Sequence, residues 1–239
     1  MSEEEFLKEF IDPECTPWTM DTYQPRVAIL RKIRPELEHM HGTLLDVGCG
    51  RSPYRDVVLS PPGKVAKYVG MDLKSDQYTN QPDLEWDGVT IPLPPNSVDT
   101  ALVTEVLEHC PEPERVLHEI NRVLRPGGFL LATVPFLWPL HDVPHDEYRY
   151  TPFSLERLCL CTGFQEIELA AMGGWDAALA TMLGLWVRRR PMGSLKQRIL
   201  QRILMPFYRR LLRLDKPPTE FSQSCMITGL SVTARKPLS

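Results

Sequence analysis

Several features that would narrow the class of this protein are missing from its 239 residues. The six cysteines form no CxxC pair, and none has a histidine at a zinc-like interval, so we expect reduced thiols without disulfides or structural zinc. The apolar run at 177–187 is well short of the roughly 20 residues that cross a bilayer. The acidic start, MSEEEFLKEF, lacks the basic-then-apolar pattern of a secretory signal, so a cytoplasmic protein is expected.

The composition is that of an ordinary globular protein, with 43% hydrophobic and 24% charged residues. A chain of 239 residues can form one α/β domain with a sizeable core. We therefore predict a single domain over 1–239, with an N-terminal extension at 1–24 and a basic helical insertion at 173–222.

The stretch LLDVGCGRSPY at 44–54 is an apolar strand that ends in an acid and a Gly-Cys-Gly turn. Gly48 and Gly50 fit a strand that turns at once into a helix and lets a ligand approach its backbone. A dinucleotide site would have glycine or alanine where this chain has Pro53. A second strand ends in Asp72, at the distance where an acid can accept hydrogen bonds from a ribose.

Hydrophobic periodicity predicts alternating strands and helices, which favours a doubly wound sheet with right-handed crossovers. The near-continuous apolar run at 129–134 is typical of a strand buried on both faces of a parallel sheet. Helices are expected over 23–40, 111–125 and 152–163, and later strands over 164–171 and 226–234.

Residues 86–135 read WDGVTIPLPPNSVDTALVTEVLEHCPEPERVLHEINRVLRPGGFLLATVP. Together with LLDVGCG, this order of motifs resembles the class I methyltransferases of the type 11 group, which use S-adenosyl-L-methionine (SAM). The resemblance implies an α/β fold: a doubly wound, mostly parallel, seven-stranded Rossmann-like sheet with a helical insertion before the last strand. It also implies SAM as the cofactor. Ser52 stands where the family usually has another glycine.

The resemblance assigns the cofactor-binding residues. Asp72, with Leu73 beside it, would hold the ribose, Asp87 would face the adenine amino group, and Glu105 would lie near the sulfonium. The methionine portion would be lined by Asp46, Gly48, Cys49 and Gly50. Carboxylates also suit a cationic sulfonium and ammonium on chemical grounds. For His109, two readings stay open, a cofactor contact and a bond to local backbone.

The loop after the fifth predicted strand, PFLWPLHDVPHDEYRYTP, supplies the catalytic candidates His141, His145 and Asp142. A histidine can take a hydroxyl proton near neutral pH, and a neighbouring carboxylate can orient it. With Asp146 these residues could instead ligate a metal, but their spacing matches no known motif, and no metal is predicted. A third reading is a loop braced by ion pairs to Arg149. Phe136 and Trp138 could form walls.

Residues 185–216 carry ten Lys or Arg and one acid, Asp215, which leaves about 13 net negative charges on the remaining chain. Apolar residues recur at helical spacing, so the segment is one amphipathic basic helix, or two that meet at Pro206. It could pack as a lid, contact an anionic membrane or form a dimer interface. No aromatic-interleaved basic platform favours nucleic acid.

The sequence therefore predicts a SAM-dependent methyltransferase that methylates an oxygen of a small-molecule, glycan or lipid-linked acceptor, in the cytoplasm or at the cytoplasmic face of the membrane. A second hypothesis is a non-catalytic SAM-binding scaffold or membrane-associated partner protein. A third, an NAD-dependent oxidoreductase, is disfavoured by Pro53 and by the EVLEH motif.

Overall fold

The computed structural model describes residues 3–74 and 81–238, and the chain divides into two compact units. The first unit comprises Met1–Arg31 and Ala171–Gly229, and the second comprises Lys32–Ala170 and Leu230–Ser239. The predicted N-terminal extension and basic insertion both belong to the first unit. The single-domain assignment stays a prediction.

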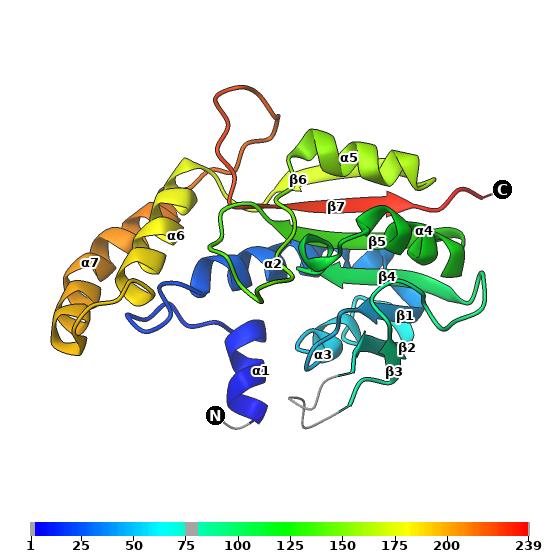
Figure 1. Ribbon diagram of the computed structural model, residues 1–239, viewed down its shortest axis with the longest axis horizontal. Coiled ribbons are helices and arrows are strands. Elements are labelled where there is room, and N and C mark those ends of the chain that lie inside the picture. The colour runs from blue at the N-terminus through cyan, green and yellow to red at the C-terminus, as the bar shows by residue number, and fades with distance from the viewer. Residues whose placement is uncertain (1–2, 75–80, 239) are drawn as a thin grey trace. The chain divides into compact units, whose positions relative to one another are not determined.

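The described residues form a seven-stranded sheet with the order β3-β2-β1-β4-β5-β7-β6 (Figure 1). The pairs β1–β2, β1–β4, β2–β3 and β4–β5 are parallel, whereas β7 runs opposite to β4 in Figure 1. The predicted doubly wound, mostly parallel sheet is confirmed. The strands are β1 (His41–Val47), β2 (Lys64–Leu73), β3 (Leu84–Trp86), β4 (Val98–Thr104), β5 (Leu124–Pro135), β6 (Gln165–Ala171) and β7 (Gly229–Arg235).

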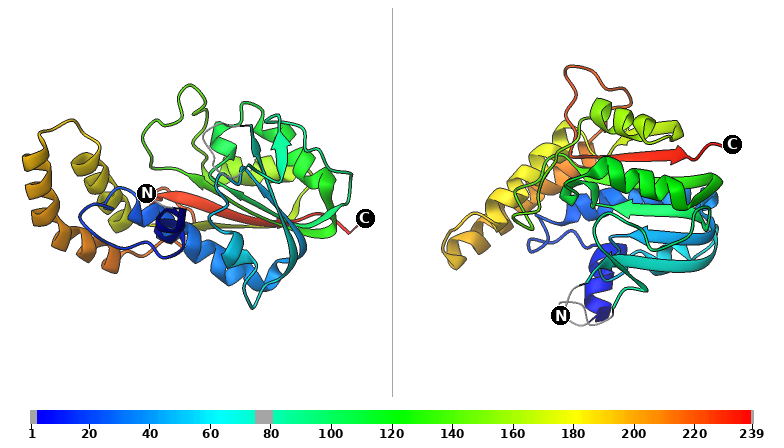
Figure 2. Two further views of the ribbon diagram at one scale, coloured as in Figure 1. Left: turned by 90° about the horizontal axis from the view of Figure 1, so that it is seen from below. Right: turned by 45° about the vertical axis from the view of Figure 1, so that its right-hand side comes forward.

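The predicted helices are present with shifted ends. They are α2 (Tyr23–Glu36), continued by the 3-10 turn η1 (Leu37–His39), then α4 (Pro113–Val123) and α5 (Pro152–Cys161), with a short α3 (Arg55–Val58) after β1. Helices α4 and α5, which contact each other, lie on one face of the sheet (Figure 2).

Helix α4 ends at Val123, two residues before its predicted end at residue 125. Its terminal carbonyls are already taken, because the N–H groups of Asn96 and Ser97 donate to the carbonyls of Arg122 and Val123. Unpaired carbonyls at a helix end need such partners, and here the following chain continues as β5 from Leu124.

The core of the second unit lies between the central strands and α4. Leu44, Leu45 and Val47 of β1 are fully buried, as is the apolar stripe of α4 that contains Val116, Leu117, Ile120 and Val123. Burying each such side chain contributes about 1.5–3 kcal/mol, so the centre of the sheet is a rigid base for the loops that follow it. The run at 129–134 is buried as predicted.

The strand order brings three loops to one edge. β1 pairs with β2 on one side and with β4 on the other, with Asp46 level with Gly70 and Leu102. Since parallel strands end at the same edge, the segments after β1, β2 and β4 emerge together where the order of strands reverses, which is where α/β sheets bind ligands.

The first unit contains α1 (Glu3–Ile11), α6 (Trp175–Arg188) and α7 (Ser194–Leu214). Helix α7 runs through Pro206 without interruption, so the one-helix alternative holds rather than two helices that meet there. Its inner face packs in a cluster of Met20, Ala180, Met205, Tyr208 and Leu211. No described helix is both long and apolar enough to cross a membrane.

Asp215, the only acid of 185–216, has a structural task. Its carboxylate accepts hydrogen bonds from the N–H groups of Gly174, at 3.1 Å, and Ala177, at 2.8 Å. These are unpaired donors at the start of α6, so Asp215 caps that helix.

Gly184 in α6 provides a stability test of the first unit. A Cβ built on it would lie 2.0 Å from the carbonyl oxygen of Met20. Alanine in a helix interior is normally favoured over glycine by about 1 kcal/mol. Because of this clash, we expect Gly184→Ala to destabilise the protein instead. The free energy of unfolding, measured by urea denaturation, should fall by about 2 kcal/mol or more.

Gly193→Ala is the matched control, because nothing lies within 4 Å of a Cβ at that position. It should leave the unfolding free energy nearly unchanged. Equal effects of the two substitutions would contradict the packing of α6 against the Met20 carbonyl.

Candidate functional site

The loop after β1 is held by its own backbone. The N–H groups of Gly48 and Cys49 donate to the carbonyl of Met71, at 2.8 and 3.0 Å. Gly48 has a φ of +67°, and a Cβ there would meet Val106 at 2.4 Å. Gly50 has a φ of +53° but faces open space, with nothing within 4 Å of a built Cβ. Gly48 is thus needed for packing, whereas Gly50 leaves room for a ligand.

Asp46 is a buried acid at the end of β1. Its Oδ2 accepts a hydrogen bond from the hydroxyl of Tyr68 at 2.5 Å, while its Oδ1 has no hydrogen-bond partner among the described residues. The pKa of Asp46 is raised to about 7, mainly by burial and to a smaller extent by the nearby Asp72. The hydrogen bond from Tyr68 acts in the opposite direction and lowers it. A cationic group would satisfy Oδ1 and favour the ionised carboxylate.

Asp72 links the ends of β1 and β2. Its Oδ2 accepts from the N–H of Gly50 at 2.5 Å and its Oδ1 accepts from the N–H of Leu73 at 2.7 Å. Leu73 pairs with Trp86 of β3, so Asp87 follows on the neighbouring strand. Both acids therefore lie at the same edge as Gly50.

Asp87 organises the turn after β3. Its Oδ1 accepts from the N–H groups of Val89 and Thr90, at 2.8 and 2.6 Å, and these bonds lower the pKa of this exposed carboxyl. It is therefore an ionised acceptor at neutral pH.

Glu105 follows β4 in a left-handed conformation, with a φ of +54°. Its Oε1 accepts from the hydroxyl of Thr133 at 2.8 Å, and its N–H donates to the Thr133 carbonyl at 3.0 Å. Burial raises the pKa of Glu105 to about 7. A strained backbone held by neighbouring groups is typical of functional sites.

Glu108, which sequence reasoning did not assign, is the most deeply buried acid of the site. The residue has no exposed surface, and neither carboxylate oxygen has a hydrogen-bond partner among the described residues. Burial first, and then the nearby Glu105, raise the pKa of Glu108 well above its ordinary value. The signal was present in EVLEH, where two acids stand three residues apart at the end of a buried strand.

Two imidazoles lie beside Glu108. The Nδ1 of His109 is 2.9 Å from the backbone carbonyl of His145, and its Nε2 is 3.7 Å from Oε1 of Glu108. The rings of His109 and His141 meet edge to face at 4.7 Å. The side chain of His109 thus contacts the carbonyl of a residue 36 positions later rather than the local backbone, and its contact with the cofactor stays a prediction. Burial, with a smaller contribution from His109, lowers the pKa of His141.

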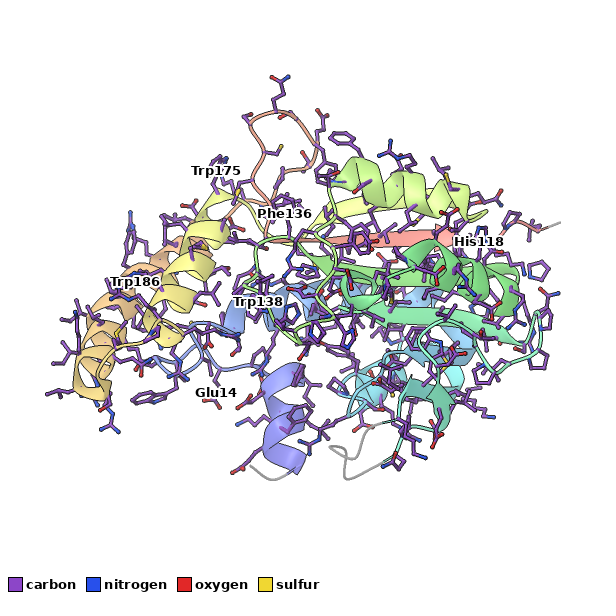
Figure 3. All side chains as sticks on the ribbon, in the orientation of Figure 1. Glu14, His118, Phe136, Trp138, Trp175 and Trp186 are labelled. Atoms are coloured by element: carbon purple, nitrogen blue, oxygen red, sulfur yellow. The ribbon has the colours of Figure 1, made fainter. Side chains whose placement is uncertain are left out.

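An ion pair braces the loop after β5. Arg149 donates to both carboxylate oxygens of Asp146, at 2.6 and 2.9 Å, which lowers the pKa of Asp146 to about 2. The bracing that the sequence left as an alternative is therefore observed. Phe136 and Trp138, labelled in Figure 3, are both half-buried in this loop.

The three predicted catalytic residues lie in different surroundings. His141 is half-buried in contact with His109, whereas the side chain of His145 is exposed. Asp142 is at the edge of the cluster, with its side chain 78% exposed and its Oδ2 4.0 Å from Nε2 of His109. The geometry thus brings His141 together with His109 and with Glu108, which the sequence had not assigned.

Known proteins share this fold and these motifs. Residues 45–132 match the model of a family described as "Methyltransferase domain". The chain is 29% identical over 159 residues to a ubiquinone biosynthesis O-methyltransferase of Paracidovorax citrulli, which covers 54% of this chain and 66% of that protein. It is 32% identical over 124 residues to a fatty-acid O-methyltransferase of Mycolicibacterium smegmatis, with 48% of this chain and 44% of that protein covered.

The chain thus spans less than two thirds of the length of these curated relatives. Among solved structures, a SAM-dependent methyltransferase from Archaeoglobus fulgidus aligns over 98% of this chain and 100% of its own, with a TM-score of 0.56 at 14% identity. Family, fold and motifs agree with one another. Residues 45–132 therefore match a methyltransferase domain of the type 11 group, and the fold is shared with a SAM-dependent methyltransferase.

Proposed function

We propose that this protein transfers the methyl group of SAM to a hydroxyl oxygen of a glycan, lipid-linked or small-molecule acceptor. The observation that carries the proposal is the meeting of two kinds of group at one sheet edge. Acids with unpartnered oxygens lie at the end of β1 and after β4, and two imidazoles lie beside the second of these, Glu108.

The loop residues fit the cofactor. The partnerless Oδ1 of Asp46 suits the ammonium group of the methionine portion, and the open space at Gly50 leaves room for it. Asp72 and Asp87, on neighbouring strands, are acceptors suited to the ribose and the adenine amino group. When bound, SAM supplies a methyl carbon that is already activated by its sulfonium.

The acceptor side has one main task, since methyl transfer gains most from alignment and from removal of the acceptor's proton. The imidazole of His141 lies near Asp146, which Arg149 fixes in place, so it can be held in one orientation. In this proposal, Asp142 and His145 contact the acceptor at the outer edge of the site. Transfer to oxygen is supported by the two relatives named as O-methyltransferases.

The exposed surface of the first unit supports an acceptor that is associated with a membrane. Helix α7 leaves Ile199, Ile203 and Phe207 exposed on the side away from its packed face, and α6 exposes Trp175 and Trp186 (Figure 3). Exposed apolar residues interleaved with arginines are the composition of helices that lie on anionic bilayers. We place this contact at the cytoplasmic face, where anionic lipids attract each nearby Lys or Arg by about 1 kcal/mol.

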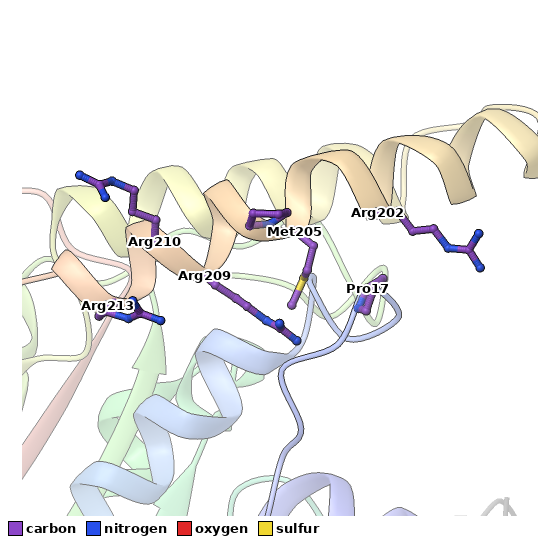
Figure 4. A pocket seen from close by; sticks show the side chains of 7 residues that line it. Pro17, Arg202, Met205, Arg209, Arg210 and Arg213 are labelled. Carbon is purple, nitrogen blue, oxygen red and sulfur yellow. The ribbon is translucent and has the colours of Figure 1, made fainter.

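A groove of about 600 Å³ beside α7, here called the arginine groove, supports the same proposal (Figure 4). In Figure 4, Arg209 and Met205 point toward the segment that carries Pro17. Four of the residues that line this groove are arginines, a residue type suited to binding phosphate. The groove is lined by Pro17, Arg202, Met205, Pro206, Arg209, Arg210 and Arg213.

The alternative is a SAM-binding partner protein without transferase activity. The arginine groove and the exposed face of α7 favour it, because both could serve recruitment without chemistry. The two functions differ in one observable, which is enzyme-dependent transfer of a methyl group.

The deciding experiment incubates the protein with methyl-labelled SAM and a cell extract, and then separates organic from aqueous products. We expect enzyme-dependent label in the organic phase, and a loss of about 100-fold or more in His141→Ala, in line with the contribution of a positioned proton acceptor. His118→Ala is the matched control, since His118 lies on the surface of α4 beside Glu114.

Label confined to the aqueous phase would replace the lipid-linked acceptor with a soluble one. Confirmed SAM binding without any transfer would refute the proposed activity and favour the partner protein.

Gly50→Ala tests the cofactor loop. The added methyl group would enter the open space in front of the loop, so SAM affinity should fall by about tenfold or more while folding is largely retained. Calorimetric titration with SAM measures the affinity. Gly163→Ala is the control for left-handed strain, because Gly163 has a φ of +86° and only an ordinary contact at 3.7 Å. A similar loss of SAM affinity in both variants would contradict the assignment.

Asp46 predicts an unusual dependence of stability on pH. Its folded pKa of about 7 lies above the unfolded value of about 3.9, so the native state binds more protons and stability falls as pH rises through this window. Between pH 5.5 and 8 the free energy of unfolding should drop by about 2 kcal/mol more in the wild type than in Asp46→Asn, because one pKa unit is worth about 1.4 kcal/mol.

Urea denaturation of the SAM-free protein at the two pH values measures this difference. The same variant should bind SAM more weakly, because the ammonium loses an ionised partner. Parallel pH profiles for the two proteins would show that the buried carboxyl of Asp46 is not the group that titrates.

A further inference from the structure

Three potential metal ligands converge from two separate segments of the second unit. Glu108 and His109 lie in the 3-10 turn η2 (Leu107–His109) after β4, and His141 lies in the loop after β5. Each offers one ligand atom, and the three atoms all lie within 4.8 Å of one another. This group of side chains is called the Glu–His–His cluster below.

Glu108 gives an independent reason to expect a cation. It is fully buried, and both of its oxygens are without hydrogen-bond partners among the described residues. An isolated buried carboxylate is costly by several kcal/mol, and such groups are normally paired or coordinate a metal. Glu105, a half-buried acid three residues earlier, is a further carboxyl group at the same strand end.

His109 is oriented as metal ligands usually are. Its Nδ1 is within hydrogen-bond distance of the His145 carbonyl, which leaves Nε2 facing Glu108 at 3.7 Å. A ring N–H directed to a carbonyl sets the tautomer and presents the other nitrogen to a metal. The buried Nδ1 of His141 lies 3.4 Å from Oδ2 of Asp146 without a hydrogen bond, so this imidazole has a ring nitrogen that no described residue satisfies.

We propose that Glu108, His109 and His141 bind a divalent transition-metal cation. Two imidazole nitrogens and one carboxylate oxygen are a donor set suited to ions such as Zn²⁺, Fe²⁺ or Co²⁺. With metal–ligand bonds of about 2.0–2.1 Å, the ligand atoms of a tetrahedral site lie about 3.3 Å apart. The distances between the ligand atoms of the cluster, now within 4.8 Å, would therefore shorten by about 1 Å when the ion binds.

The proposed site differs from the metal alternative considered from sequence. His145 and Asp142 are not ligands, since the side chain of His145 is exposed and only its carbonyl contacts His109. Glu108 takes their place. The spacing matched no motif because the ligands come from the ends of two different strands.

Three protein ligands leave a coordination position open for a further oxygen. The role of the cation rests on the proposed function: it would hold the acceptor oxygen and lower the pKa of the bound hydroxyl. It would thereby replace His141 as the group that activates the hydroxyl, whose proton would pass to water, with His141 acting as a ligand.

Metal binding can be tested without any activity. Tag-free protein is treated with a chelator, dialysed and titrated with Co²⁺, with the visible absorption of the ion and the heat of binding as readouts. We expect one Co²⁺ per chain. Glu108→Gln and His141→Ala should each weaken binding by about tenfold or more, while His118→Ala, which alters a histidine beside an acid on the surface of α4, should bind as the wild type does.

Circular dichroism checks that each variant is folded, and Glu108→Gln keeps the shape of the side chain, so a loss of binding is separable from a loss of structure. Absence of Co²⁺ binding in the folded wild type would overturn the proposal. Binding that survives in both cluster variants would also overturn it. If the protein does not bind Co²⁺ and still transfers methyl groups in the presence of chelator, the metal site is refuted and the proposed function stands. If it binds Co²⁺ but transfers no methyl group, the proposed function is refuted and the metal site stands.

Discussion

Buried negative charge at the carboxyl edge of the sheet is the constraint on which the rest of the site depends. Asp46, Glu105 and Glu108 follow two adjacent parallel strands, and each is buried enough to have a raised pKa. Keeping such groups ionised is unfavourable in a low-dielectric interior. The rigid core of β1, β4 and α4 provides the stability that tolerates them, and cationic ligands are what would make them favourable.

The polar contacts present in the structure relieve only part of this charge. Tyr68 donates to one oxygen of Asp46, and Thr133 donates to one oxygen of Glu105. The remaining oxygens of Asp46 and Glu108 have no partners among the described residues. They lie at the ends of two neighbouring strands, so one position suits the cation of a cofactor and the other suits a metal ion. In the proposed site, the cofactor and acceptor halves would thus use the same electrostatic principle.

The parts of the fold that follow from local chemistry could be predicted from the sequence. The apolar run before Asp46 and the glycines after it predict β1 and its loop, because few other residues permit the left-handed turn at Gly48. Glu108 could not be recognised in this way. Its importance arises from complete burial beside His141, a residue 33 positions later in the sequence, and no local periodicity encodes that approach.

Helix α7 is a second feature that the sequence alone could not decide, because proline in a helix interior normally destabilises the helix by about 3 kcal/mol. The packing of Met205, Tyr208 and Leu211 on either side of Pro206 outweighs this preference, and the helix continues. Tertiary contacts, rather than intrinsic propensity, supply most helical stability in proteins.

That packing also separates the two faces of α7. Since Met205, Tyr208 and Leu211 already fill the buried face, the exposed Ile199, Ile203 and Phe207 are not needed to hold the helix in place. Asp215 is engaged as the cap of α6, so it does little to neutralise the surrounding arginines. The helix therefore presents apolar and cationic groups that its own unit does not use, and this surplus is the physical basis for assigning it a role in contact with an anionic partner.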